Sequence, residues 1–203
     1  MGERGAITTR MTAEARREQI LDATKALAAA QGFHAVSIEA VSREAGITRP
    51  IVYSHFGDLQ GLLEALVERE SHRALTQLAA VLPTNLAGDD ARQILLSGMR
   101  GYLEVVASDP DTWRLILMST EGAPALLRER IAGGRAAVVA QLAQAVAAGF
   151  GPARSPDPEL TAHMFSATSD ASARLLLDDP AQYPVDRLLA HTRWILEQFR
   201  FGD

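Results

Sequence analysis

The sequence predicts an all-α protein of about nine helices. Apolar residues recur at helical spacing along almost the whole chain of 203 residues. The alternating apolar and polar pattern of a β-strand never persists beyond a few residues. Eight of the nine prolines lie between the helical stretches, and Pro50 is the exception. With 47% hydrophobic residues, the chain has enough apolar material for a packed core.

The first three predicted helices are short, and each is preceded by a residue that can cap it. Serine and threonine side chains accept hydrogen bonds from the free N–H groups of a first helical turn. Gly32 and Gly46 follow the first two of these helices and favour their termination. The predicted helices are residues 13–31 after Thr12, residues 38–45 after Ser37, and residues 49–55 after Thr48.

Longer helices joined by short loops are expected over the rest of the chain. The segment 149–158 contains three prolines and two glycines and is the clearest loop. We expect the domain boundary at the fourth helix, with one domain over residues 1–60 and a larger one over 61–203. The predicted helices are 58–82, one from Asp89 or Asp90 to about 107, one opened by Asp109-Pro110, 124–148, 159–178 and 185–201.

Composition excludes several classes of site. The chain has no cysteine, so it has no disulfides, cysteine-ligated zinc or thiol nucleophile. No uninterrupted apolar run approaches the ~20 residues of a membrane span, and we expect a cytoplasmic protein without membrane contact. No catalytic motif, metal site or cofactor site is evident, so no enzymatic activity and no cofactor are expected.

Charge is distributed unevenly along the chain. The formal net charge is −5, yet residues 1–56 carry seven Lys and Arg against six acidic residues. The N-terminal segment therefore has a net charge of +1, which leaves −6 for the remainder. This asymmetry is a weak indication of an anionic partner at the N-terminal end.

Residues 37–56 have the spacing of a helix-turn-helix. A capped helix, a tight turn at Gly46-Ile47 and a second capped helix follow one another. Apolar side chains of both helices would form one small core, and polar side chains of the second helix would remain outside. Such side chains can donate hydrogen bonds to phosphates or base edges, although a helix corner within a bundle is the alternative. The outward residues are Arg49, Pro50, Ile51, Tyr53, Ser54 and His55.

A broader pattern surrounds this motif. The first helix contributes Ile20, Leu21, Ala23 and Gly32 to it. The other parts are Ser37 at the second cap, the turn AGIT at 45–48 and the segment YSHF at 53–56. With these residues, the stretch 17–66 resembles the DNA-binding domain of the tetracycline-repressor (TetR) family. The resemblance covers about a quarter of the chain. It implies that the remaining helices bind an effector and form a homodimer.

The resemblance implies a transcriptional regulator, which we expect to be a repressor. It would bind a palindromic operator in double-stranded DNA and be released by a small-molecule effector. Three positions depart from the family pattern, namely Ser42, Ile51 and Leu59, the last replacing a lysine that contacts phosphate. Our hypothesis is that Ile51 contacts a thymine methyl group. The residues expected to contact DNA are Ser37, Thr48, Arg49, Pro50, Ile51, Tyr53, Ser54 and His55, with Thr8, Thr9, Arg10, Arg16 and Arg17 as an N-terminal arm.

The helix predicted over 159–178 carries small residues at close spacing, and the helix over 185–201 has apolar residues on more than one side. A helix with so wide an apolar surface must bury it, and the resemblance implies burial against a second subunit. The alternative is packing inside one chain. The expected interface residues are Leu160, Met164, Ala167, Ala171, Leu175, Leu188, Thr192, Ile195 and Phe199.

An effector site is implied by the resemblance alone. Bulky or polarisable side chains on the middle helices are the candidates, and each is also an ordinary core residue. They are Met99, Tyr102, Leu103, Trp113, Leu117, Met118, His163 and Phe165. Two other functions stay open, namely a DNA-binding dimer without an effector and an all-helical enzyme or carrier.

Overall fold

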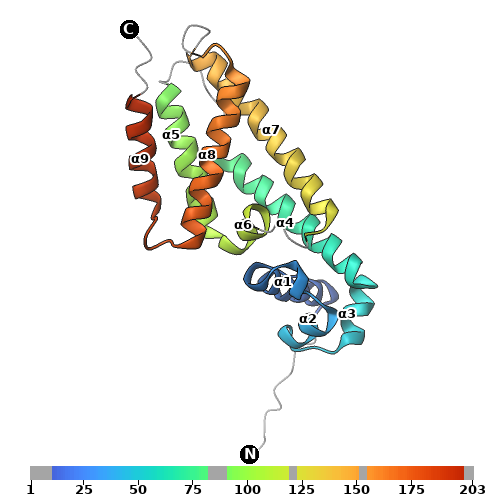
Figure 1. The fold of residues 1–203 in the computed structure, drawn as a ribbon. Coiled ribbons are helices and arrows are strands. Elements are labelled where there is room, and N and C mark those ends of the chain that lie inside the picture. The colour runs from blue at the N-terminus through green and yellow to red at the C-terminus, as the bar shows by residue number, and fades with distance from the viewer. Residues whose placement is uncertain (1–10, 82–90, 119–122, 151–154, 199–203) are drawn as a thin grey trace, which may run out of the picture.

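The computed structural model describes residues 11–81, 91–118, 123–150 and 155–198, and all regular structure in these ranges is helical. The N-terminal unit, α1 to α3, lies at one end of an elongated molecule, and α5 to α9 form a bundle at the other (Figure 1). The elements are α1 (Ala13–Gln31), a 3₁₀ turn (Phe33–Ala35), α2 (Ile38–Glu44), α3 (Arg49–Phe56), α4 (Leu59–Val81), α5 (Ala91–Ser108), α6 (Pro110–Leu117), α7 (Ala125–Phe150), α8 (Pro158–Asp178) and α9 (Val185–Gln198).

The predicted starts of the first two helices are confirmed by their hydrogen bonds. The hydroxyl of Thr12 accepts the N–H of Ala15, and that of Ser37 accepts the N–H of Ala40, both at 3.1 Å. The stop after α1 is also confirmed, because Gly32 has φ +84°, in the region that favours glycine. Local sequence signals therefore determine these helix ends.

Side-chain capping is absent at the starts of α3 and α6, contrary to expectation. Thr48 and Asp109 occupy the predicted positions, but neither side chain caps its helix. Both helices carry proline in the first turn, whose ring fixes a helical φ without a cap. The Asp109 carboxylate instead accepts a hydrogen bond from Nζ of Lys25 at 2.7 Å.

The other predicted helices agree with the structure within a few residues. The expected start at Asp89 or Asp90 lies outside the described residues, as do 199–201 at the expected end of the last helix. The helix predicted over 124–148 continues as α7 to Phe150, into the segment that was expected to be a loop.

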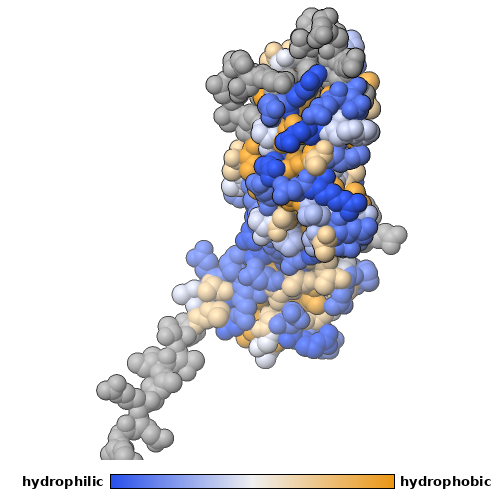
Figure 2. Space-filling model, turned by 90° about the vertical axis from the view of Figure 1, so that its left-hand side faces the viewer, coloured by the Kyte–Doolittle hydropathy of each residue, from blue (hydrophilic) through white to orange (hydrophobic). Residues whose placement is uncertain are grey.

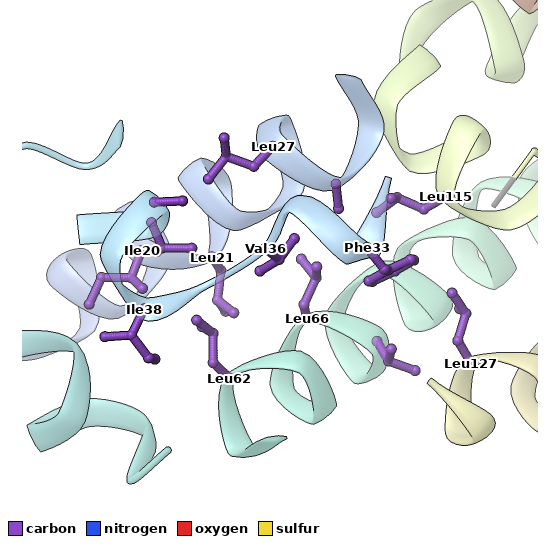
Figure 3. Close-up of a cluster of buried hydrophobic side chains, with 14 of the residues drawn as sticks. Ile20, Leu21, Leu27, Phe33, Val36, Ile38, Leu62, Leu66, Leu115 and Leu127 are labelled. Atoms are coloured by element: carbon purple, nitrogen blue, oxygen red, sulfur yellow. The ribbon is translucent and has the colours of Figure 1, made fainter. Parts of the chain in front are cut away.

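Two clusters of buried apolar side chains are stabilised by different sets of helices. The first joins α1, α2 and α3 to the start of α4. Ile20 of α1, Ile38 of α2 and Leu62 of α4 are among its members (Figure 3). It also includes Leu115 of α6 and Leu127 of α7. The N-terminal unit therefore packs directly on the bundle.

The second cluster lies inside the bundle. Met99 and Leu103 of α5 pack there with Trp113 of α6 and Leu188 of α9. Ala74 places the later part of α4 in this second cluster, whereas the earlier part belongs to the first. Because α4 is a single helix of 23 residues, it connects the two cores rigidly.

Candidate functional site

The predicted helix-turn-helix is present as α2, a tight turn and α3. Gly46 has φ +65°, and the N–H of Ile47 donates to the carbonyl of Ser42 at 2.9 Å, which closes the turn. From α1, Nε2 of Gln19 donates to the carbonyl of Ala45 at 2.9 Å. The turn is therefore held both by its own backbone and by α1.

Ser42, one of the departures from the family pattern, is accommodated behind this turn. Its side chain is buried, and its hydroxyl donates to the carbonyl of Ile38 one turn earlier at 2.6 Å. A buried hydroxyl costs little when it has such a partner. The serine therefore occupies a packed position without an unsatisfied polar group.

The inner and outer sides of α3 differ as the pattern predicted. Val52 is fully buried, and Ile47 and Phe56 pack partly against the first cluster. On the opposite side Tyr53 is 50% exposed, in a helix that covers only eight residues. The side chains that the structure leaves exposed are Ser37, Thr48, Arg49, Pro50, Tyr53 and Ser54.

Two of the expected DNA-contacting residues do not project freely. Ile51 is partly buried and packs against the first cluster, and His55 is also partly buried, with its ring 6.2 Å from that of Phe56. Residues of a helix that flank its buried side are drawn toward the core. The hypothesis that Ile51 contacts a thymine methyl loses support, since much of this side chain is committed to the core. Leu59, in place of the expected lysine, packs on the same cluster.

Charged side chains around α3 already have partners within the chain. Arg49 forms an ion pair with Glu39 of α2 at 2.5 Å, and both side chains are more than half exposed. The guanidinium of Arg17 lies 4.8 Å from the centre of the Phe56 ring. Arg16 donates to Gln19 at 2.7 Å. The expected arm residues Thr8, Thr9 and Arg10 lie outside the described residues.

A cavity of about 130 Å³ lies inside the bundle, bounded by α4, α5, α6, α7 and α8. Its walls contain five of the eight residues that were predicted to bind a ligand. These five are Met99, Tyr102, Trp113, Leu117 and Phe165.

The other three predicted ligand residues point elsewhere. Leu103 is fully buried in the second cluster, because it lies a third of a helical turn from Tyr102. Met118 is 43% exposed and His163 is exposed, so neither lies in the cavity wall. These three residues therefore do not line this cavity.

Sequence reasoning missed the wall contributed by α7. Ile131, Val138 and Leu142 line the cavity at intervals of seven and four residues, which places them on one side of the helix. This periodicity is visible in the sequence. Periodicity does not reveal which neighbouring helix an apolar side faces, so the cavity itself could not be predicted.

One side of the cavity contains a polar cluster. The hydroxyl of Tyr102 donates to Asp170 at 3.0 Å, and Arg135 pairs with the same carboxylate. Burial raises the pKa of Tyr102 well above its ordinary value, and the negative charge of Asp170 raises it further. Tyr102 therefore remains a neutral hydroxyl at physiological pH.

Charged and polar side chains connect the N-terminal unit to the bundle. We call them the junction network, which consists of Lys25, Glu70, Gln77, Asp109 and Thr112. Nζ of Lys25, on α1, lies 2.7 Å from Asp109 and 3.4 Å from Glu70 of α4. The Glu70 side chain is only 1% exposed, and the Thr112 hydroxyl of α6 lies between Glu70 and Asp109, within hydrogen-bonding distance of both carboxylates. Burial alone would raise the pKa of Asp109, but hydrogen bonds from Lys25 and Thr112 outweigh burial and lower it.

The junction network continues to the cavity wall. Nε1 of Trp113, which lines the cavity, donates to Gln77 at 2.9 Å. Nε2 of Gln77 donates to Asp109 at 3.3 Å. An unbroken series of polar contacts therefore runs from the cavity to Lys25 in α1.

An apolar surface on α8 is exposed, and we call Leu160, Met164, Ala167, Ala171 and Leu175 the α8 face. Leu160 is 56%, Met164 65% and Leu175 40% exposed, and the two alanines are also exposed. All five had been predicted as interface residues, and they lie on one side of the helix.

The residues predicted for the last helix lie differently. Leu188 is buried in the second cluster, and Thr192 is buried with its hydroxyl 3.3 Å from the sulfur of Met99. Their outward neighbour on α9 is Trp194, which is 55% exposed. The assignment of Leu188 and Thr192 to an interface is therefore corrected, because their side of α9 packs on α5.

Two further interface residues were predicted for the last helix. Ile195 is half-buried, and Phe199 lies outside the described residues. Seen from the α9 side, the bundle surface shows hydrophobic side chains between hydrophilic ones (Figure 2).

One helix in the described ranges, Ala125–Gly149 of α7, is long and apolar enough by composition to cross a membrane. Only 17% of its most apolar window is buried inside the chain. A core helix of a soluble protein can meet the same criteria. Because the apolar stripe of α7 lines the cavity against α4 and α8, we treat it as a bundle helix.

Comparisons with known proteins agree with this architecture. Residues 20–66 match the family model for bacterial regulatory proteins of the tetR family. The chain is 29% identical over 122 residues to the HTH-type transcriptional regulator AlkX of Mycobacterium tuberculosis, and 26% identical over 107 residues to the HTH-type transcriptional activator FasR of Mycolicibacterium smegmatis. These alignments cover 55% and 53% of this chain and 57% and 48% of the relatives, so the match spans about half of each curated protein.

Solved structures match over nearly the whole chain. A TetR-like transcriptional regulator from Rhodococcus sp. RHA1 superposes with a TM-score of 0.76 at 22% identity, over 96% of this chain and 100% of that one. A TetR-family transcriptional regulator from Rhodococcus sp. superposes with a TM-score of 0.67 at 26% identity, over 90% and 97%. These proteins are regulators and not enzymes. In its helix-turn-helix segment, residues 20–66, the chain matches the tetR family of bacterial regulatory proteins, and its fold is that of the TetR-like regulators.

Proposed function

We propose that the chain is a ligand-responsive transcriptional regulator that binds double-stranded DNA through α3. The observation that carries this proposal is the polar, exposed side of α3 opposite the fully buried Val52. Arg49 and Tyr53 on that side can donate hydrogen bonds to phosphates and base edges. The hydroxyls of Ser37 and Thr48 lie near the starts of α2 and α3, where N–H groups favour an anion.

We propose that two copies associate through the α8 face. An exposed apolar surface that includes Leu160, Met164 and Leu175 is costly for a monomer in water. The exposed indole of Trp194 on α9 supplies a further apolar contact. Two-fold symmetry would present two α3 helices to a palindromic operator, with half-sites about one or more DNA turns apart.

The cavity is the proposed effector site. A transcriptional regulator of the same fold from Saccharomonospora viridis was solved with choline, and SmeT with triclosan. These neighbours support small-molecule binding within this fold. An effector acts on DNA binding only if its affinity differs between two conformations of the protein.

The junction network is the proposed link between effector and DNA. A molecule against Trp113 would change its hydrogen bond to Gln77, and thereby the contact of Asp109 with Lys25. Because Lys25 belongs to α1, the N-terminal unit would rotate relative to the bundle. In a dimer, this rotation changes the separation of the two α3 helices.

The domain division is likewise proposed within α4. The expected boundary at residues 60 and 61 lies in its first turn, yet Leu62, Leu66 and Val67 still belong to the first cluster. Ala74 belongs to the second cluster, so the division falls better between Val67 and Ala74. We propose a cytoplasmic location, in keeping with DNA as the partner.

Binding of the full-length protein to DNA from upstream of its own gene, measured by gel shift, tests the proposal. Tyr53→Ala and Arg49→Ala should each weaken binding about tenfold, because each removes a donor to the duplex. Arg193→Ala, on exposed α9, removes a cation far from α3 and should have no effect. Unchanged binding by both α3 variants, or failure to bind any upstream fragment, would count against the proposal.

The direction of control requires a second measurement. We propose repression with release by the effector, although one relative is named as an activator. Run-off transcription from the bound promoter should fall when the protein is added. A rise would indicate activation instead, and binding that no small molecule reverses would favour a regulator without an effector.

A further inference from the structure

The cavity is small and is lined largely by apolar and aromatic side chains. Its volume is about 130 Å³, and an apolar cavity of about 150 Å³ accommodates benzene. Three aromatic residues form part of the wall, namely Tyr102, Trp113 and Phe165. The rings of Tyr102 and Trp113 meet edge to face, with centres 5.3 Å apart. This geometry suits a single aromatic ring better than a long chain.

Charges at the cavity are already compensated within the protein. Arg135 pairs with Asp170, which also accepts the hydrogen bond of Tyr102. Arg130 pairs with Glu68 at 2.6 Å. Burying an ionised ligand would need a free counter-charge, and each of these charged wall residues is already paired.

One buried polar atom on the wall has no partner among the described residues. The hydroxyl oxygen of Ser71, on α4, is buried and forms no hydrogen bond with any protein group in the described structure. A buried hydroxyl without a partner is costly, and a serine hydroxyl can be redirected by rotation about one side-chain torsion. Ser71 is therefore available to bind a molecule inside the cavity. By contrast, the hydroxyl of Ser169 on the same wall donates to the carbonyl of Phe165 at 2.9 Å.

We infer that the cavity binds a neutral molecule of about one aromatic ring that carries a single hydroxyl or similar group, hydrogen-bonded to Ser71. This inference rests on the proposed function, since it names the chemical class of the effector. Ser71 immediately follows Glu70, which belongs to the junction network. A molecule bound to Ser71 thus contacts the helix that both cores share.

Four probes of similar size and different charge test the inference, namely benzyl alcohol, toluene, benzoate and benzylammonium. Trp113 serves as the reporter, because Trp194→Phe leaves it as the single tryptophan of the full chain. Fluorescence titration of this variant should give the tightest binding for benzyl alcohol, weaker binding for toluene, and no saturable binding for the two ions. Tightest binding of either ion would overturn the inference.

Matched serine variants identify the hydrogen bond. In the Trp194→Phe background, Ser71→Ala should raise the dissociation constant of benzyl alcohol about fivefold. It should change the dissociation constant of toluene by less than about twofold. Ser169→Ala removes a hydroxyl that is already bonded within its own helix, and it should not change the preference between the two probes. Equal loss for benzyl alcohol and toluene in Ser71→Ala, or no binding of any probe, would overturn the inference.

Gel shifts with the unmodified protein, which retains Trp194, separate this inference from the proposed function. Probe binding without DNA binding would contradict the regulator proposal and leave the ligand class intact. DNA binding without probe binding would contradict the ligand class alone.

Discussion

Two regions of this molecule place side chains in unfavourable surroundings, one by burying charges and the other by exposing apolar groups. At the junction network, charged side chains are buried, and Glu70 is 1% and Lys25 11% exposed. On the α8 face, apolar side chains are exposed, and Met164 is 65% exposed. Burying charges and exposing apolar surface both cost free energy. Each feature therefore points to a requirement other than the stability of one isolated chain.

The two regions differ in the kind of interaction that they provide. A buried ion pair depends on distance and direction, so the junction network specifies one orientation of α1 relative to α4 and α6. Apolar contact has no direction, so the α8 face favours association without selecting a hydrogen-bond geometry. We infer that the first region controls orientation within a chain and the second controls association between chains.

The largest expected effect is at Glu70. Glu70→Ala should lower the free energy of unfolding by about 3 kcal/mol, because it removes a carboxylate near Lys25 and Arg69 in a buried site. Urea denaturation monitored by circular dichroism measures this difference. Glu68, on the same helix as Glu70, forms an exposed pair with Arg130 of α7, and Glu68→Ala should cost less than about 0.5 kcal/mol. Equal effects would mean that burial of the pair is unimportant.

The next effect tests the α8 face. Met164→Asp should raise the dissociation constant of the dimer about thirtyfold, or ~2 kcal/mol, because it places a charge in an apolar contact. Sedimentation velocity over a range of concentrations measures the change. Met11→Asp makes the same substitution at a methionine that is 46% exposed beside α1, and it should leave the dimer intact. An unchanged dissociation constant in Met164→Asp would mean that the dimer interface lies elsewhere.

A pH dependence distinguishes the junction network from surface charge. Because the folded-state pKa of Asp109 is lowered, its contribution is present above about pH 4 and is lost as the pH falls through the lowered pKa. Asp109→Asn should cost about 1.5 kcal/mol at neutral pH and flatten the loss of stability as the pH falls below about 4. Urea midpoints at several pH values measure both quantities. A pH profile parallel to that of the unmodified protein would exclude Asp109 as the titrating group.

The smallest expected effect concerns an exposed ion pair. Glu39→Gln should strengthen DNA binding about twofold, because it releases Arg49 from a pair that lies largely in water. Fluorescence anisotropy with labelled operator DNA is sensitive enough for this change. Glu44→Gln removes the same charge from the exposed end of the same helix. A comparable gain in that variant would mean that overall charge, and not the release of Arg49, increases the affinity.

The sequence by itself determined the helices of this protein and the resemblance of its helix-turn-helix segment to the tetR family. Local signals sufficed, because the caps at Thr12 and Ser37 and the glycine stop at Gly32 act within a few residues. The turn at Gly46 and the outward position of Tyr53 also follow from spacing alone. The exposed α8 face was likewise visible as a stripe at helical spacing.

Only the tertiary structure decided which neighbour each helix side meets. Leu188 and Thr192 pack inside their own chain, Leu103 faces away from the cavity, and Ile51 packs partly on the core. The contact of Lys25 with Asp109 joins residues 84 positions apart. The periodicity of a helix specifies which of its residues share a side, but the packing of α4 against its neighbours determines what that side touches.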